Sequence, residues 1–262
     1  MLTMGVDIGS TASKAVILED GVRILARQIV PVGTGTRGPM EVYQNTLLEA
    51  GVKREDIARV VATGYGRLKF AEADRELSEV SCHGQGVRFL CPDVRTVIDI
   101  GGQDAKALLL DAQGNLDNFI MNDKCAAGTG RFLEAMARVL DVQVEEMGDL
   151  SERSGNPVSI SSTCAVFAES EVISRLSNGE KIEDIVAGIH ASVAKKVGGL
   201  AIRVGYLQKV AMSGGVARNK GIVRAMEREL KCQIVVPEEC QLAGAIGAAL
   251  FAYRDMMRQA RK

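Results

Sequence analysis

The chain of 262 residues contains no tryptophan, and aromatic residues make up only 4% of it. That scarcity argues against a surface that stacks bases or sugars. The two histidines, His83 and His190, leave little room for a His-rich metal site or a Ser/His/Asp triad. A strongly basic face is absent as well, because 32 Lys and Arg are balanced by 33 Asp and Glu. We therefore expect no nucleic acid partner.

The sequence also lacks the signals of export and membrane insertion. No apolar run approaches the ~20 residues that a membrane span needs, and the first residues show no basic region followed by an apolar one. We expect a cytoplasmic protein with no membrane partner. C-x-x-C is absent, and the six cysteines of a cytoplasmic chain are not expected to form a disulfide framework. The composition, 47% hydrophobic and 25% charged, is that of a globular protein.

An internal repeat organises the chain. Residues 5–18 read GVDIGSTASKAVIL, and residues 97–110 read VIDIGGQDAKALLL. Aligned at an offset of 92 residues, the identical pairs include Asp7 with Asp99, Gly9 with Gly101, and Lys14 with Lys106. Each copy runs into a turn signal and a further apolar run. Each half is therefore expected to begin as a meander of three strands, with D-I-G at its first tight turn.

Both halves then pass through helical stretches to another strand that ends in a loop of small residues. These strands are expected at 58–62 and 209–212, where the offset has grown to 150 residues. The second half thus carries about 58 extra residues, an insertion within roughly 122–208. Periodicity also predicts a strand at 232–236 and helices near 39–50, 76–90, 129–139, 168–177, 181–204, 219–230 and 243–258. This alternation predicts an α/β protein with a cleft between two related halves.

The two D-I-G turns predict a phosphate site. Glycine in a tight turn lets backbone N–H groups point at phosphate oxygens, and a nearby carboxylate can hold Mg²⁺, mostly through water. A plain turn is the alternative for one D-I-G alone, but two copies in register favour phosphate. Lysines on a strand surface are the ordinary interpretation of Lys14 and Lys106, although both could reach phosphate. The residues expected at the two turns are Asp7, Gly9, Ser10, Thr11 and Lys14, and Asp99, Gly101, Gly102, Gln103 and Asp104.

Three motifs resemble those of the superfamily of acetate and sugar kinases, heat-shock chaperone ATPases and actin. DIGSTASK at 7–14, DIGGQD at 99–104 and SGGVARN at 213–219 are similar to its phosphate-one, phosphate-two and adenosine motifs. The resemblance implies two ribonuclease-H-like subdomains that close on ATP·Mg²⁺. These would be residues 1–93 with roughly 245–262, and residues 94–244 with the insertion, whose helices are expected to bind the iron–sulfur cluster that a second resemblance implies below.

The same resemblance implies further residues beside the nucleotide: Gly128, Thr129, Gly130, Gly214, Gly215, Asn219 and Gln241. A kinase of this superfamily needs a general base beside its acceptor hydroxyl, and no Asp or Glu is persuasive in that role. Phosphoryl transfer to water is the better interpretation, because a glutamine can orient a water molecule. We expect Gln103 to do so, with an ordinary loop amide as the alternative.

Two segments of the insertion carry a cysteine in a shared layout, NDKCAAG at 122–128 and SSTCAVF at 161–167. Polar capping residues precede the cysteine and a helical pattern follows it. Cys125 and Cys164 are therefore expected at or near helix N-termini, where the dipole favours the thiolate that binds metal. Two cysteines cannot complete a four-thiolate iron–sulfur site, but a symmetric dimer supplies four. Buried structural cysteines and a zinc site are the alternatives.

The longer motifs NDKCAAGTGRFLE and SSTCAVFAESEVIS resemble the activator component of 2-hydroxyacyl-CoA dehydratases, in the BadF/BadG/BcrA/BcrD ATPase family. ATGYGR at 62–67 and ELSEVSCHG at 76–84 match as well. The resemblance implies a homodimer that shares one [4Fe-4S] cluster through Cys125 and Cys164. It further implies an ATPase that passes one electron from reduced ferredoxin or flavodoxin to a dehydratase. A small-molecule kinase and an ATP-binding regulator of the same superfamily remain alternatives.

Overall fold

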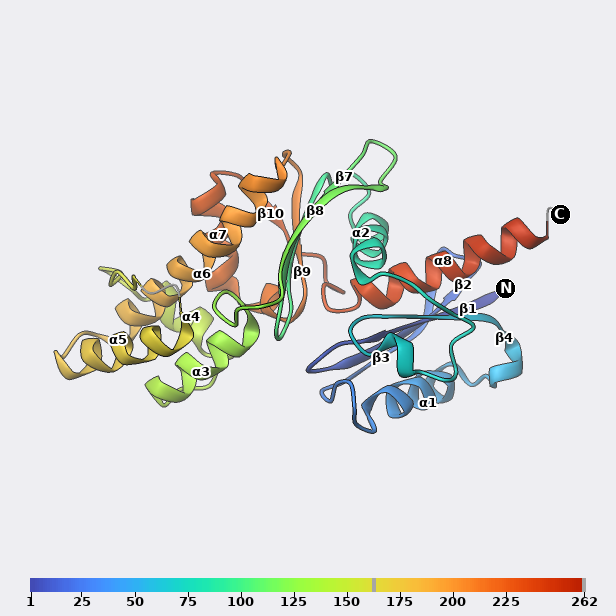
Figure 1. Cartoon of the computed structure of the whole chain (residues 1–262), viewed down its shortest axis with the longest axis horizontal. Coiled ribbons are helices and arrows are strands. Elements are labelled where there is room, and N and C mark those ends of the chain that lie inside the picture. The colour runs from blue at the N-terminus through green and yellow to red at the C-terminus, as the bar shows by residue number, and fades with distance from the viewer. Residues whose placement is uncertain (162–163, 261–262) are drawn as a thin grey trace. The chain divides into compact units, whose positions relative to one another are not determined.

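The computed structural model describes residues 1–161 and 164–260, and Figure 1 shows its helices and strands. The chain forms two compact units. Unit 1 comprises Met1–Val94, Leu110–Leu116 and Pro237–Lys262, and unit 2 comprises Arg95–Leu109 and Asp117–Val236. The subdomain boundaries expected from the sequence stay a prediction.

Unit 1 contains a five-stranded mixed sheet in the order β3-β2-β1-β4-β5. Its strands are β1 (Leu2–Ile8), β2 (Ser13–Glu19), β3 (Arg23–Val30), β4 (Ile57–Thr63) and β5 (Arg75–Glu76). The first three form an antiparallel meander, whereas β4 runs parallel to β1, and β5 runs parallel to β4. The predicted meander and the predicted strand near 58–62 are both present.

Helices cover both faces of the unit 1 sheet (Figure 1). On β2, Ala15 and Ile17 join the apolar cluster that includes α1, whereas Val16 and Leu18 join the cluster that includes α8. Because successive side chains of a strand point to opposite faces, a strand covered on both sides is apolar throughout. The elements that complete the unit are α1 (Gly38–Ala50), α2 (Glu79–Leu90), α8 (Ala243–Gln259), η1 (Arg54–Asp56) and η2 (Arg67–Lys69).

The start of α8 packs very closely on its neighbours because small residues make the contacts. A Cβ at Gly5 of β1 would overlap backbone atoms of Ala245 and Ala249. A Cβ at Gly86 of α2 would overlap the carbonyl oxygen of Ala243. Glycine is therefore required at both positions for α8 to reach the sheet and α2.

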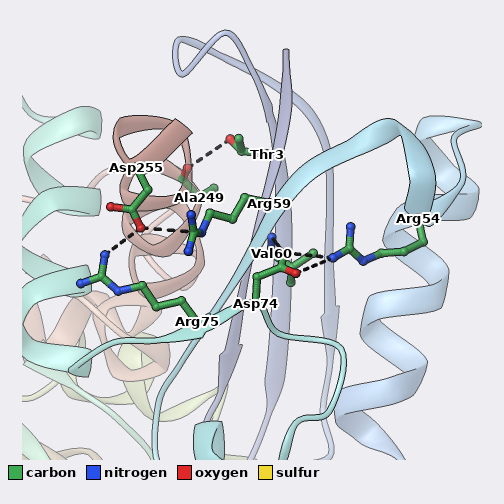
Figure 2. Close-up of polar contacts among 8 residues, drawn as sticks. All are labelled: Thr3, Arg54, Arg59, Val60, Asp74, Arg75, Ala249 and Asp255. Atoms are coloured by element: carbon green, nitrogen blue, oxygen red, sulfur yellow. Dashed lines mark hydrogen bonds and ion pairs between the residues drawn. The ribbon is translucent and has the colours of Figure 1, made fainter. Parts of the chain in front are cut away.

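Hydrogen bonds of charged side chains connect β5 and the residue before it to the rest of unit 1 (Figure 2). Asp255 of α8 accepts a 2.7 Å hydrogen bond from Arg75 of β5. Asp74 accepts two hydrogen bonds of 2.9 Å from Arg54 and one of 2.7 Å from the N–H of Val60. Exposed ion pairs stabilise a fold only slightly, so these contacts mainly fix the position of β5 and of Asp74 directly before it.

Unit 2 repeats the strand order of unit 1. Its sheet runs β10-β9-β6-β7-β8, and β7 is antiparallel to β6, while β9 is parallel to it. The meander of β6, β7 and β8 therefore corresponds to that of β1, β2 and β3, as the repeat predicts. The strands are β6 (Thr96–Ile100), β7 (Ala105–Leu110), β8 (Leu116–Asn122), β9 (Val210–Ser213) and β10 (Ile234–Val235).

Among its described residues, unit 2 also contains six helical segments: α3 (Gly130–Leu140), α4 (Met147–Glu152), α5 (Ala165–Ser177), α6 (Ile182–Val204), η3 (Gly215–Arg218) and α7 (Lys220–Leu230). Of the α-helices, only α4 lacks a counterpart in the sequence prediction. By length and hydropathy α6 qualifies as a membrane span, but 67% of its apolar window is buried within the structure, as in a core helix. That residues 122–208 form an insertion stays a prediction.

Candidate functional site

Unit 1 presents the first D-I-G turn between β1 and β2. Asp7 lies opposite Lys14 in the strand register, and Lys14 Nζ is 3.2 Å from the Asp7 carboxylate. The N–H of Gly9 donates a 3.0 Å hydrogen bond across the turn. Ser10 and Thr11 are partly exposed in the same turn. The structure thus brings the expected residues of this turn together and binds Lys14 to Asp7.

Three residues that the sequence did not assign to the site surround Asp7, which is 3% exposed. A Cβ at Gly64 would lie 2.5 Å from Asp7 Oδ1. A Cβ at Gly244, in the first turn of α8, would lie 2.9 Å from both Asp7 Oδ2 and His83 Nε2. The imidazole of His83 on α2 therefore lies near the same carboxylate. The ELSEVSCHG match was the one signal in the sequence that singled out this part of α2.

The second D-I-G turn, in unit 2, repeats the pairing of aspartate with lysine. Lys106 lies opposite Asp99, with Nζ 3.0 Å from Asp99 and 2.7 Å from Asp104. The Ser213 hydroxyl donates to Asp99 at 2.7 Å. Lys106 is 2% exposed, so its interpretation as a surface lysine is wrong, whereas Lys14 is half-buried beside Asp7. Strand register places each lysine opposite a buried carboxylate that needs a counter-ion.

Glycines and the start of α3 meet at the second D-I-G turn. The N–H of Gly130 donates to the carbonyl of Gly101 at 2.9 Å, and the N–H of Arg131 donates to that of Gly102 at 2.8 Å. Gly214 follows β9 with φ +87°. A Cβ at this position would overlap the carbonyl oxygen of Ile100 and would lie 3.1 Å from Asp99 Oδ1. The structure therefore brings together glycines that are up to 113 positions apart, from Gly101 to Gly214.

Three other expected residues of unit 2 differ in how they can contact a ligand. Gln103 is exposed in the second D-I-G turn. Thr129 is buried, and its hydroxyl donates to the carbonyl of Ala126 at 2.6 Å. Gly128 has φ +89° and packs on the side chain of Lys196. Of these three residues, Gln103 is the one whose side chain is open to solvent.

Asn219 caps α7 and contacts a buried histidine. Its Oδ1 accepts from the N–H of Ile222 at 3.1 Å, and its Nδ2 lies 3.3 Å from His190 Nε2. Burial lowers the pKa of His190 to about 4, so the ring is neutral near pH 7 and Nε2 accepts from the amide. Both ends of the Asn219 side chain are thus engaged behind η3, which begins at Gly215. Gln241 lies in unit 1 and is partly exposed.

Cys125 lies in the turn between β8 and α3, where Lys196 of α6 holds its sulfur. Lys196 Nζ donates to Cys125 Sγ at 3.1 Å, and Asn122 Nδ2 donates to the Cys125 carbonyl at 2.9 Å. The Lys196 hydrogen bond lowers the pKa of Cys125, while partial burial opposes that effect. The helix α3 begins only at Gly130, five residues later. An ammonium group, rather than the expected helix dipole, therefore favours the thiolate.

Cys164 directly precedes α5, as expected, and is exposed. Ser162 and Thr163 of the same motif lie outside the described residues. Val166 and Phe167 in the first turn of α5 are 68% and 70% exposed. The surface beside Cys164 is therefore apolar.

The other four cysteines are buried or half-buried. Burial raises the pKa of Cys82 to about 12, and it also raises the pKa values of Cys91 and Cys232. Cys240 is buried. Within the described part of the chain, no three His, Cys, Asp or Glu side chains come together as a metal site.

Comparison with known proteins places these features in one family. The model of the BadF/BadG/BcrA/BcrD ATPase family matches residues 4–252. The 2-hydroxyisocaproyl-CoA dehydratase activator of Clostridioides difficile is 60% identical over 255 residues, which cover 97% of this chain and 96% of that protein.

Solved structures share the fold. The activator of the 2-hydroxyisocaproyl-CoA dehydratase from Clostridium difficile, with bound ADPNP, has a TM-score of 0.96 at 58% identity, over 100% of this chain and 97% of that one. A ROK family glucokinase from Streptomyces griseus has a TM-score of 0.60 at 15% identity, over 97% of this chain and 100% of that one. At that low identity the likeness shows the fold alone, and it confirms the expected fold class.

Proposed function

This chain belongs to the BadF/BadG/BcrA/BcrD ATPase family, and from that premise we propose that it is an ATP-dependent activator of a 2-hydroxyacyl-CoA dehydratase. Its activity would be ATP hydrolysis coupled to the transfer of one low-potential electron. The dehydratase activator of Clostridioides difficile supports this proposal, because the match covers nearly the whole of both chains.

The two D-I-G turns are the proposed sites for the phosphates of ATP and for Mg²⁺. Asp7 and Asp99 are buried beside lysines. Mg²⁺ usually keeps several waters and needs only one or two protein carboxylates together with phosphate oxygens, so this donor set fits. When bound, Mg²⁺ neutralises charge on the phosphates. Gly9, Ser10 and Thr11 offer backbone and hydroxyl donors in unit 1.

In unit 2, Gln103 is the proposed residue that orients the attacking water, because its exposed amide can donate and accept hydrogen bonds. Phosphoryl transfer depends mainly on positioning and charge neutralisation, so an amide that orients the attacking water would suffice for this role. The other residues proposed to contact the nucleotide are Lys14, Gly101, Gly102, Asp104, Gly128, Thr129, Gly130, Gly214, Gly215, Asn219 and Gln241.

Cys125 and Cys164 are the proposed ligands of a [4Fe-4S] cluster. Such a cluster needs four thiolates, and two identical chains would supply two each across an isologous interface. The residues fit this role, since Cys125 has a lowered pKa and Cys164 is exposed beside an apolar surface. When bound, the cluster supplies a one-electron carrier between reduced ferredoxin or flavodoxin and the dehydratase.

One observation carries the proposed coupling of ATP to the cysteines. The segment that bears Cys125 is tied by two backbone hydrogen bonds to the second D-I-G turn, from Gly130 to Gly101 and from Arg131 to Gly102. A change in the turn on binding or hydrolysis of ATP would therefore pull directly on the segment that holds Cys125. The start of α3 thus contacts the second D-I-G turn and also belongs to the segment that bears Cys125.

ATP can shift the dimer only if it binds two conformations with different affinity. In the proposed cycle, ATP favours the conformation that delivers the electron to the dehydratase, and hydrolysis restores the other. Both backbone bonds to the second D-I-G turn lie within unit 2, so a rearrangement of this unit is enough to transmit the change.

The proposal is tested by anaerobic activation of a 2-hydroxyacyl-CoA dehydratase with reduced ferredoxin. We expect activation with ATP, none with ADP, and none from Cys164→Ala, which should still bind nucleotide. Activation without ATP would contradict the proposed coupling. Phosphorylation of a small acceptor that does not depend on Cys125 or Cys164 would identify a kinase instead.

A further inference from the structure

The side chain of Lys196 is fixed at both its stem and its tip. Its Nζ donates to Cys125 Sγ at 3.1 Å. Its methylene groups pack on the backbone at Gly128, where a Cβ would lie 3.5 Å from Lys196 Cδ. Gly128 has φ +89°, a conformation that suits glycine. The backbone next to Cys125 is thus shaped around the lysine stem.

The partner of this lysine is fixed as well. Asn122 at the end of β8 donates to the Cys125 carbonyl at 2.9 Å, and the hydrogen bonds at Gly130 and Arg131 hold the other end of the segment. Lys196 itself stands on α6, a buried helix of 23 residues. The contact between Nζ and Sγ therefore joins α6 to a turn whose two ends are held by hydrogen bonds. It differs in this from a pairing of two mobile surface side chains.

A neighbouring lysine serves as an internal reference. Lys195 precedes Lys196 on α6 and is exposed, whereas Lys196 is half-buried. The two have the same charge and side-chain length. Only the position of Lys196 on the helix directs its ammonium group at a cysteine.

Accepting the function proposed above, we infer that Lys196 is a positioning residue for Cys125 and that its ammonium group favours the reduced state of the cluster. One electron from reduced ferredoxin or flavodoxin makes the cluster and its thiolates more negative by one charge. A hydrogen-bonded cation beside a ligand sulfur stabilises that added charge. The lysine keeps its proton and no covalent bond forms or breaks. In the homodimer, two such lysines would act on one cluster.

The test compares Lys196→Met with Lys195→Met in anaerobically reconstituted dimer. The midpoint potential is measured by redox titration with electron paramagnetic resonance of the reduced cluster. We expect Lys196→Met to disfavour reduction by about tenfold or more, which is about 59 mV towards more negative potential for a one-electron couple. Lys195→Met should match the wild type, and Lys196→Arg should recover part of the shift. Equal potentials in the two methionine variants would overturn the inference.

A second readout needs no cluster. In the metal-free protein, iodoacetamide should label Cys125 several-fold more slowly in Lys196→Met than in Lys195→Met, while labelling of Cys164 stays the same. Unchanged labelling of Cys125 would overturn the contact on which the inference rests. If the wild type holds no iron but this labelling difference appears, the proposed function fails while the contact stands.

Discussion

Acid should weaken unit 2 through a single histidine. His190 is fully buried, and burial, together with the positive charge of Arg228, lowers its pKa from 6.5 to about 4. In the unfolded chain this imidazole titrates near its ordinary pKa. Between the two values the unfolded state therefore binds more protons than the folded state. The stability that the neutral ring contributes is present above pH 6.5 and is lost as the pH falls towards 4.

The magnitude follows from the shift in the His190 pKa. A shift from 6.5 to about 4 corresponds to about 3 kcal/mol of unfolding free energy at about 1.4 kcal/mol per unit. Between pH 7 and pH 5 the same linkage removes about 2 kcal/mol. Carboxylates titrate nearby, so the effect is measured against His190→Gln, which keeps a polar side chain but does not titrate in this range.

The assay is urea unfolding of the metal-free protein at pH 7 and pH 5. Circular dichroism reports the transition, because the chain has no tryptophan, and hydrogen exchange of peptides from α6 and α7 assigns the loss to unit 2. We expect the wild type to lose about 2 kcal/mol more than His190→Gln on acidification. Equal losses would contradict this expectation, because they would mean that His190 does not titrate differently on unfolding.

Three further predictions concern a buried ion pair, the packing of α8 and the reactivity of Cys125. Lys106→Met should reduce the unfolding free energy by about 3–5 kcal/mol, because it leaves the buried carboxylate of Asp99 without its counter-ion; a urea-measured loss below about 1 kcal/mol would contradict the pairing. Gly86→Ala should lower the unfolding free energy by about 1–3 kcal/mol, because the added methyl group overpacks against α8. The control Gly199→Ala, with open space around it, should be neutral or stabilising in the same assay. At pH 7, iodoacetamide should modify Cys125 faster than Cys91 in the metal-free protein, since their pKa values move in opposite directions; mass spectrometry that found Cys91 faster would contradict this.

The repeat made much of the fold predictable. An offset of 92 residues aligned two meanders, and the two sheets share one strand order. Periodicity located the long helices, because each buries a continuous apolar face. The helix α4 escaped prediction because its six residues span fewer than two turns and show no reliable period.

The site was predictable in its residue types but not in its pairings. Lys14 and Lys106 stood in apolar strands, and only the register of β2 and β7 shows that each faces a carboxylate. Lys196 is 71 residues from Cys125, and no local pattern joins them. Tertiary packing decides such contacts, so a single sequence without its fold does not reveal them.

Two chains are proposed to hold one cluster and to use ATP to drive its electron onward. The most direct test is iron and acid-labile sulfide content per dimer in anaerobically purified protein, with Cys125→Ala, Cys164→Ala and the control Cys91→Ala. A [4Fe-4S] cluster predicts about four irons and four sulfides per dimer in the wild type and in Cys91→Ala, and loss of both in the other two variants. A wild type that stays free of iron after reconstitution, or a Cys125→Ala protein that keeps its iron, would contradict the account.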